Sequence, residues 1–93
     1  MNPVGAVLWL IGALLDLVLL VLIINMVLSW LFAFDLVGRG NRFVNSTYEA
    51  TQRLVAPILG PIRRVIPPVG GIDFSPMVVF FGVLFLKQLF PGL

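Results

Sequence analysis

A long apolar run near the start of the chain constrains the fold more than any other feature of the sequence. From Val4 to Phe34 the chain carries one charged side chain, Asp16, and few other polar groups. A helix over this range would be about 46 Å long, whereas the hydrocarbon core of a bilayer is about 30 Å thick. We therefore predict a transmembrane helix over residues 4–34 that tilts or emerges into the membrane interface.

This run does not have the pattern of a cleavable signal peptide. A signal peptide has basic residues ahead of a shorter apolar core and a cleavage site. Here no Lys or Arg precedes Arg39, and the apolar run is longer. We expect the helix to stay in the mature protein, with Trp9 and Trp30 near its two interfaces.

The composition excludes several classes of protein. Of 93 residues, 60% are hydrophobic and 11% are charged, against about 25% charged in a soluble domain. An ordinary soluble domain and a disordered tail are therefore excluded. The absence of Cys and His removes disulfides and the commonest metal ligands, and a net charge of only +2 does not indicate nucleic acid binding. We expect no cofactor, because an apolar Met such as Met26 or Met77 packs far more often than it ligates haem.

A second apolar run, over residues 75–90, predicts a second transmembrane helix. From Pro76 to Phe90 this helix would be about 22 Å long, which is short for a span, so we expect residues 72–74 at membrane depth or a locally thinner bilayer. Lys87 lies near its end, where a Lys can reach outward to the interface. The alternative for so short a run is the buried helix of a soluble protein.

A turn and a helix start precede this run, at Gly70, Gly71, Asp73, Ser75 and Pro76. Two glycines permit a turn that is closed to other residues. Ser75 fits the N-cap position, Pro76 fits the first helical turn, and Asp73 would lie near the positive end of the helix.

The segment between the two runs, residues 35–74, is amphipathic and interrupted by prolines. We predict two short helices near residues 45–56 and 58–66, because each proline disfavours helix at the residue before it. Asn45 or Ser46 is the expected cap, since Ser46 and Glu49 have the spacing of a capping box.

One side of this segment is apolar and the other side is basic, which suits a membrane surface. The predicted membrane-surface contacts are Arg53, Arg63, Arg64, Ile58 and Ile62. The alternative is a helical hairpin that packs on the protein's own spans and has no role with lipid.

Polar side chains in the first span predict contacts within the membrane. Asn25 lies about 180° round the helix from Asp16, and Ser29 follows on Asn25's side. One neighbouring helix can hardly cover both faces, so we expect an oligomer or a larger assembly. The alternative for Asn25 and Ser29 is bonding to their own backbone.

We also predict an ion pair between Asp16 and Lys87. If the two spans pack antiparallel, these side chains lie at similar depth, about 21 Å and 18 Å from the cytoplasmic ends of their helices. A charge in the membrane is usually paired. The alternative is that Asp16 faces a partner chain or is protonated, while Lys87 reaches the interface alone.

The central segment holds five of the six basic residues, which predicts its orientation. Short loops rich in Lys and Arg stay in the cytoplasm. We therefore expect a cytoplasmic loop and both termini on the opposite side of the membrane.

The run from Pro57 to Pro76, PILGPIRRVIPPVGGIDFSP, resembles the signature of the YggT family of small integral membrane proteins. Ser29-Trp30 and Thr51 also look like that family, and the resemblance covers nearly the whole chain. There are two departures. Many members have Asn-Pro where this chain has Asn45-Ser46, and some members carry two copies of the unit where this chain has one.

The resemblance implies an all-α membrane protein with two transmembrane helices joined by an amphipathic, proline-interrupted interfacial helical loop. It implies the inner, cytoplasmic membrane of a bacterium, with a plastid membrane as the alternative. Relatives are associated with osmotic tolerance and ion uptake, with maturation of a b-type cytochrome in plastids, and with division or nucleoid distribution. The family has no agreed catalytic residues to carry over.

The sequence therefore favours a non-enzymatic accessory or assembly subunit of a larger membrane complex. Its expected partners are the bilayer, anionic lipid head groups, and other membrane subunits or further copies of itself. Without His, Cys or paired carboxylates there is no visible nucleophile and base. The alternative is an ion-conducting or osmotic-stress-response oligomer, in which Asn25 and Ser29 would line the pore.

Overall fold

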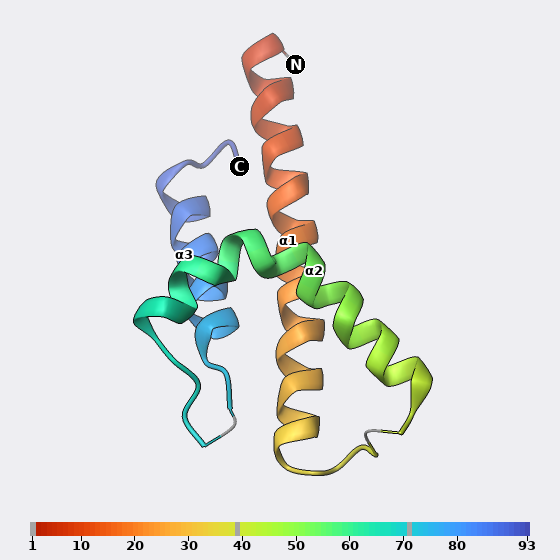
Figure 1. Ribbon diagram of the computed structural model, residues 1–93. Coiled ribbons are helices and arrows are strands. Elements are labelled where there is room, and N and C mark those ends of the chain that lie inside the picture. The colour runs from red at the N-terminus through yellow and green to blue at the C-terminus, as the bar shows by residue number, and fades with distance from the viewer. Residues whose placement is uncertain (1, 39, 71) are drawn as a thin grey trace.

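Three helices form the described part of the chain, in agreement with the predicted all-α class. The computed structural model describes residues 2–38, 40–70 and 72–93. Helix α1 spans Pro3–Ala33, α2 spans Arg42–Val65 and α3 spans Ser75–Leu89. Figure 1 shows α3 antiparallel to α1, beside its middle part, while α2 arches across the pair. The longest dimension, 50 Å, reflects the length of α1.

Helix α1 has defined caps at both ends. At its start, Pro3 follows the N-cap residue Asn2, whose side chain accepts a hydrogen bond from the Gly5 N–H. At its end, Asp35 adopts a left-handed φ of 57°. The Asp35 N–H donates to the Phe32 carbonyl at 3.1 Å, and the Leu36 N–H donates to the Leu31 carbonyl at 2.9 Å. This pair of bonds is a Schellman motif, which stops the helix where the apolar run ends.

The two apolar helices differ in length. Among the described residues, α1 is the one helix long and apolar enough to cross a membrane, by length and composition. Helix α3 is apolar but has 15 residues.

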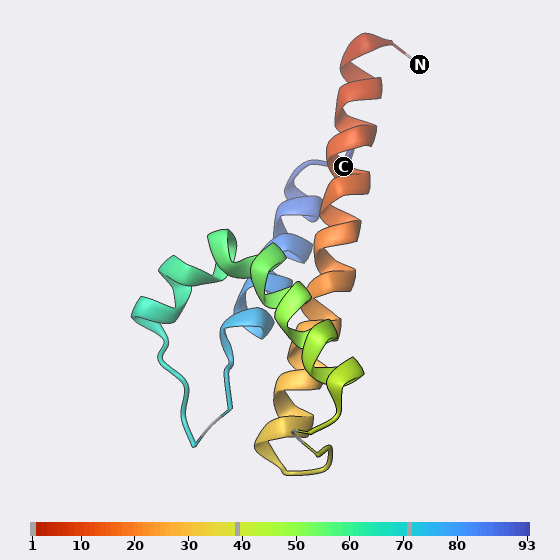
Figure 2. The same ribbon diagram turned by 45° about the vertical axis from the view of Figure 1, so that its right-hand side comes forward.

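Helix α2 is continuous where two short helices were predicted. It begins at Arg42, and the side chain of Asn41 accepts from the Val44 N–H at 3.2 Å, so neither Asn45 nor Ser46 is the cap. Pro57 and Pro61 lie inside the helix. Proline has a helical φ, so the chain can continue as a helix through both prolines, but its missing N–H and the clash of its ring with the carbonyl four residues earlier bend the helix. Both views show α2 bending around its middle (Figures 1 and 2).

The turn between α2 and α3 has the backbone that its glycine pair predicts. Gly70 has a φ of 60°, and Val69 and Ile72 exchange two backbone hydrogen bonds of 3.0 Å. Gly71 lies outside the described residues. Pro76 occupies the first turn of α3, but Ser75 is not its cap. Phe74 stands at the N-cap position and makes no side-chain cap bond.

The core lies where the three helices meet. Leu22 of α1 and Val55 and Leu59 of α2 are almost fully buried, and side chains of α1 and α3 pack around them: Val18, Val21, Val79 and Phe80. Outside this junction the surface is strongly apolar. Trp9 is 62% exposed and Phe81 is 60% exposed, and many other large apolar side chains are exposed as well. A soluble monomer usually presents less apolar surface to water.

Candidate functional site

A buried hydrogen bond ties α1 to α2. The Asn25 Nδ2 donates to the Thr51 Oγ1 at 3.1 Å, and the Thr51 hydroxyl donates in turn to the Tyr48 carbonyl at 2.8 Å. Asn25 has an exposed fraction of 0%, and Thr51 is 6% exposed. The predicted contact of Asn25 is therefore with the central helix of its own chain.

This bond removes one argument for an oligomer. The opposite faces of Asp16 and Asn25 on the first helix predict a partner chain that covers one of them. The structure covers the Asn25 face with α2 and places Lys87 of α3 against Asp16. A single chain therefore supplies a neighbour for each face, because the central segment packs as a second helix against α1.

Ser29 and Trp30 continue the buried face of α1. Ser29 is 6% exposed and lies one turn beyond Asn25. Near it, the rings of Phe32 and Tyr48 meet edge to face at 5.2 Å. Within the described part of the chain, the Asn25 Oδ1 and the Trp30 Nε1 are buried without a hydrogen-bond partner. This end of the interface between α1 and α2 therefore has unused hydrogen-bonding groups.

The predicted ion pair between α1 and α3 is present. The Lys87 Nζ donates to the Asp16 Oδ1. The Lys87 side chain is 24% exposed and that of Asp16 is 62% exposed. One turn before Asp16 in α1, Gly12 is buried, and a Cβ at its position would lie 3.1 Å from the Leu93 carbonyl carbon. The face of Gly12 and Asp16 thus receives α3 and the residues that follow it.

A second ion pair clamps the end of α2 to the start of α3. The Arg63 Nε donates to the Asp73 Oδ2 at 2.7 Å, while the Asp73 Oδ1 accepts from the Ser75 N–H at 3.0 Å. The Ser75 hydroxyl donates to the Ile66 carbonyl at 3.3 Å. Asp73 therefore supplies the acceptor at the start of α3 that was predicted of Ser75, and Ser75 bonds across the turn instead.

The predicted membrane-surface residues divide into two groups. Arg53 and Arg64 are exposed, and Ile58 is 39% exposed. Arg63 instead turns inward to Asp73, and Ile62 is half-buried. The exposed apolar side chains of α2 form a stripe beside the buried one, made of Phe43, Leu54, Ile58 and Val65. Helix α2 therefore packs on its own chain and also presents an outer apolar face, so it combines features of both alternatives.

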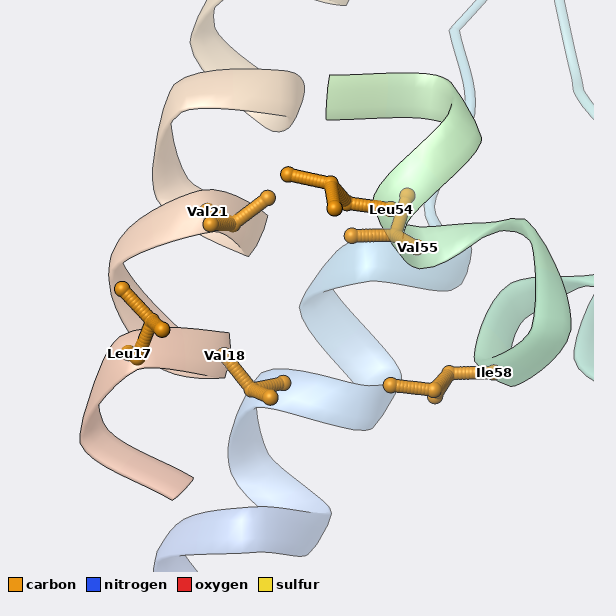
Figure 3. Close-up of a pocket in the computed structure, with 6 residues that line it drawn as sticks. All are labelled: Leu17, Val18, Val21, Leu54, Val55 and Ile58. Atoms are coloured by element: carbon orange, nitrogen blue, oxygen red, sulfur yellow. The ribbon is translucent and has the colours of Figure 1, made fainter. Parts of the chain in front are cut away.

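Figure 3 shows a shallow groove where α1 and α2 meet. Its volume is about 130 Å³. Only apolar side chains line it, three from each helix: Leu17, Val18, Val21, Leu54, Val55 and Ile58. Such a lining offers no group for acid–base or nucleophilic chemistry.

The chemistry of these side chains is that of contacts between helices. In the stretches 2–38, 40–70 and 72–93, no three Asp, Glu, His or Cys side chains come together as a metal site would require. The two described ion pairs and the Asn25–Thr51 bond each join two different helices or the turn between them. These residues thus hold the three helices in a fixed arrangement.

Three contributions were not predicted from the sequence: Asp35 ends α1, Thr51 receives Asn25, and Leu59 is fully buried in the core. Thr51 was noted only for its resemblance to the family, and not as the partner of Asn25. Leu59 lies four residues after Val55 and eight after Thr51, so this helical spacing would have found it. The Arg63–Asp73 pair depends on the turn at Gly70, and the spacing of charges alone gave no signal for it.

The described part of the chain is an all-α unit of three helices, with one candidate membrane span and a shorter apolar helix. The chain matches the CCB3/YggT family model over residues 4–93, so it belongs to the CCB3/YggT family.

The curated relatives are longer than this chain and have no stated activity. A Haemophilus influenzae protein is 50% identical over 68 residues, which cover 73% of this chain and 33% of that protein. Escherichia coli YggT is 38% identical over 73 residues, 78% of this chain and 37% of the relative. Both are described only as uncharacterized. The chain thus spans about a third of the length of these relatives. No solved structure matches it.

Proposed function

We propose that this chain is a non-enzymatic accessory or assembly subunit of a larger membrane protein complex. The observation that carries the proposal is the use of its buried polar side chains. Asn25, Thr51 and Asp73 bond to neighbouring helices or to the turn, and none of them lines the apolar groove. A rigid three-helix unit with a large apolar surface is suited to holding other membrane subunits.

In this proposal α1 and α3 cross the cytoplasmic membrane of a bacterium, and α2 lies at its cytoplasmic interface. The antiparallel packing of α1 and α3 supports this arrangement (Figure 1). The amphipathic character of α2 also supports it, because Arg53 and Arg64 are exposed beside an outer apolar stripe. Such helices bind a surface through apolar burial and attraction to anionic lipid.

Co-purification tests the role in assembly. The tagged chain is extracted from native membranes in a mild detergent, and the captured proteins are identified by mass spectrometry. We expect one defined set of membrane proteins, absent when an unrelated membrane protein of similar size carries the tag. The Asp73→Ala variant, which breaks the clamp between α2 and α3, should accumulate but capture less of that set. Capture of no defined protein would contradict the proposal.

Ion conduction is the alternative, and it makes a different prediction. A pore needs polar side chains that face water, but Asn25 and Ser29 are buried on the face of α1 that α2 covers. We therefore expect no ion flux through liposomes that contain only the purified chain. Selective flux that disappears in Asn25→Leu would instead establish conduction and overturn the assembly role.

A further inference from the structure

The ion pair between Asp16 and Lys87 lies on the face of the molecule that α2 leaves open. Asn25, which contacts α2, lies nine residues after Asp16, or about 180° round the helix. Both views show α2 crossing one side of the α1–α3 pair (Figures 1 and 2). The Asp16 side chain is 62% exposed there.

This pair is only partly satisfied inside one chain. Its Lys87 Nζ has three N–H donors and its carboxylate has two acceptor oxygens. In the described part of the chain, each of these two side chains makes one hydrogen bond, the one from the Lys87 Nζ to the Asp16 Oδ1. Lipid tails cannot supply the missing partners, and a charged group facing lipid is costly.

Large apolar side chains surround the exposed carboxylate on the same face of α1. Within about 40° of Asp16 round the helix lie Trp9, Leu20, Ile23 and Val27, all 40–62% exposed. Ala13, one turn before Asp16, is exposed and small, so another helix can come close at this height. The face thus has the apolar rim and polar centre of a helix–helix contact within a membrane.

We propose that this face binds a second copy of the chain, so that the two Asp16–Lys87 pairs join in one network of two carboxylates and two ammonium groups. The charges favour a second copy because each chain presents one anion and one cation at the same height along α1. Two chains inserted in the same orientation are related by an axis normal to the membrane. That rotation sets the Asp16 of each chain opposite the Lys87 of the other, so the interface is self-complementary.

Such a dimer requires α1 and α3 to cross the membrane together, as proposed above, but it does not require a wider complex. Purified protein in liposomes therefore tests it separately from co-purification. The chain has no native Cys, so single-Cys variants report one position each.

The test compares Ile23→Cys with Ile24→Cys. These neighbours lie at almost the same depth and are 40% and 37% exposed. Round the helix, Ile23 lies about 20° from Asp16 on the side of Gly12 and α3, near the proposed axis, whereas Ile24 lies about 80° away on the other side. On oxidation we expect severalfold more disulfide-linked dimer from Ile23→Cys, and the difference should persist when the liposomes are diluted with lipid. Equal cross-linking at the two positions, or none from Ile23→Cys, would overturn the proposal.

Two further variants test the role of the charges. With Ile23→Cys as reporter, exchanging the charges in Asp16→Lys/Lys87→Asp should retain the cross-link, because the network keeps its two anions and two cations. Replacing both in Asp16→Leu/Lys87→Leu leaves an apolar surface and no unpaired charge, so the chain should remain helical but lose most of its cross-link. An undiminished cross-link in this apolar variant, or cross-linking of Ile23→Cys to a different protein in native membranes, would contradict the proposal.

Discussion

Asn25 and Thr51 show how one hydrogen bond can decide the position of a helix. Thr51 has a second partner, the Tyr48 carbonyl, whereas the only described bond of the Asn25 side chain is the one to Thr51. The Asn25 Oδ1 is already buried without a partner. Loss of the Thr51 hydroxyl would therefore leave a fully buried amide with no described bond.

The two single substitutions should consequently differ in cost. Thr51→Val should lower the free energy of unfolding by about 1–3 kcal/mol, the penalty for an unpaired buried polar group. Asn25→Leu should cost less, because it also removes the unpaired oxygen. In the double variant, Asn25→Leu should recover part of the loss caused by Thr51→Val. A double-mutant cycle from unfolding in mild detergent checks this, and strictly additive costs would mean that the bond does not contribute.

Asp35 is the second residue whose effect can be isolated. A non-glycine residue in the left-handed region costs about 1–2 kcal/mol relative to an ordinary conformation, and glycine avoids that cost. Asp35→Gly should therefore stabilise the chain by up to about 1 kcal/mol at the end of α1. Asp35→Ala is the matched control, since it removes the carboxylate but keeps the Cβ. If Ala raises the unfolding temperature as much as Gly does, strain at this position is not the reason.

At the scale of elements, the clamp of Arg63 and Asp73 joins the end of α2 to the start of α3. The two side chains are only 26% and 11% exposed, so removing one partner costs more than it does in an exposed pair, because the other charge is left partly buried and unpaired. Arg63→Ala and Asp73→Ala should each destabilise the fold by about 2 kcal/mol, as loss of a charged hydrogen bond does. Their costs should not add.

Arg64 provides the control for the clamp. It is the next residue in α2, it carries the same charge, and it is exposed. Arg64→Ala should change the free energy of unfolding by no more than about 0.5 kcal/mol, as surface substitutions usually do. Equal losses in Arg63→Ala and Arg64→Ala would show that general charge, and not the contact with Asp73, is responsible.

Two helical glycines should respond in opposite ways to alanine. A Cβ at Gly12 would collide with the backbone of Leu93, whereas a Cβ at Gly82 meets nothing within 4 Å. Gly82→Ala should therefore stabilise α3 by about 0.5–1 kcal/mol, the ordinary gain from replacing glycine inside a helix. Gly12→Ala should instead destabilise the packing of α1 against the end of the chain. Unfolding temperatures in detergent would show the contrast, and gains at both sites would contradict the close approach at Gly12.

These elements also show what the sequence could and could not predict. Apolar runs predict α1 and α3 well, because their composition leaves few alternatives. The single helix α2 was not predicted, because each proline disfavours helix at the residue before it. In the folded chain, the buried stripe of Thr51, Val55 and Leu59 packs against α1 and keeps the helix continuous. The Asp16–Lys87 pair was predictable from depth alone, but the Arg63–Asp73 pair depends on a turn that only the folded chain brings together.

At the scale of the whole molecule, the proposed arrangement fixes the orientation of the chain in the membrane. The proposed arrangement places the segment around Gly40 in the cytoplasm and both chain ends outside. The exposed residues Gly40 and Pro91 can each be replaced by Cys. Leu14, which is 54% exposed within the apolar run of α1, provides a third position. Without native Cys, any labelling comes from the introduced residue.

Labelling with a membrane-impermeant maleimide then tests the orientation. In intact spheroplasts, Pro91→Cys should react at once, whereas Gly40→Cys should react only after the membrane is opened. Leu14→Cys should react poorly in both states, because lipid covers it and a thiol there stays protonated and shielded from the reagent. Reaction of Gly40→Cys from outside would reverse the topology. Ready reaction of Leu14→Cys would remove α1 from the membrane altogether, and with it the reason for Asp16 to seek a second chain.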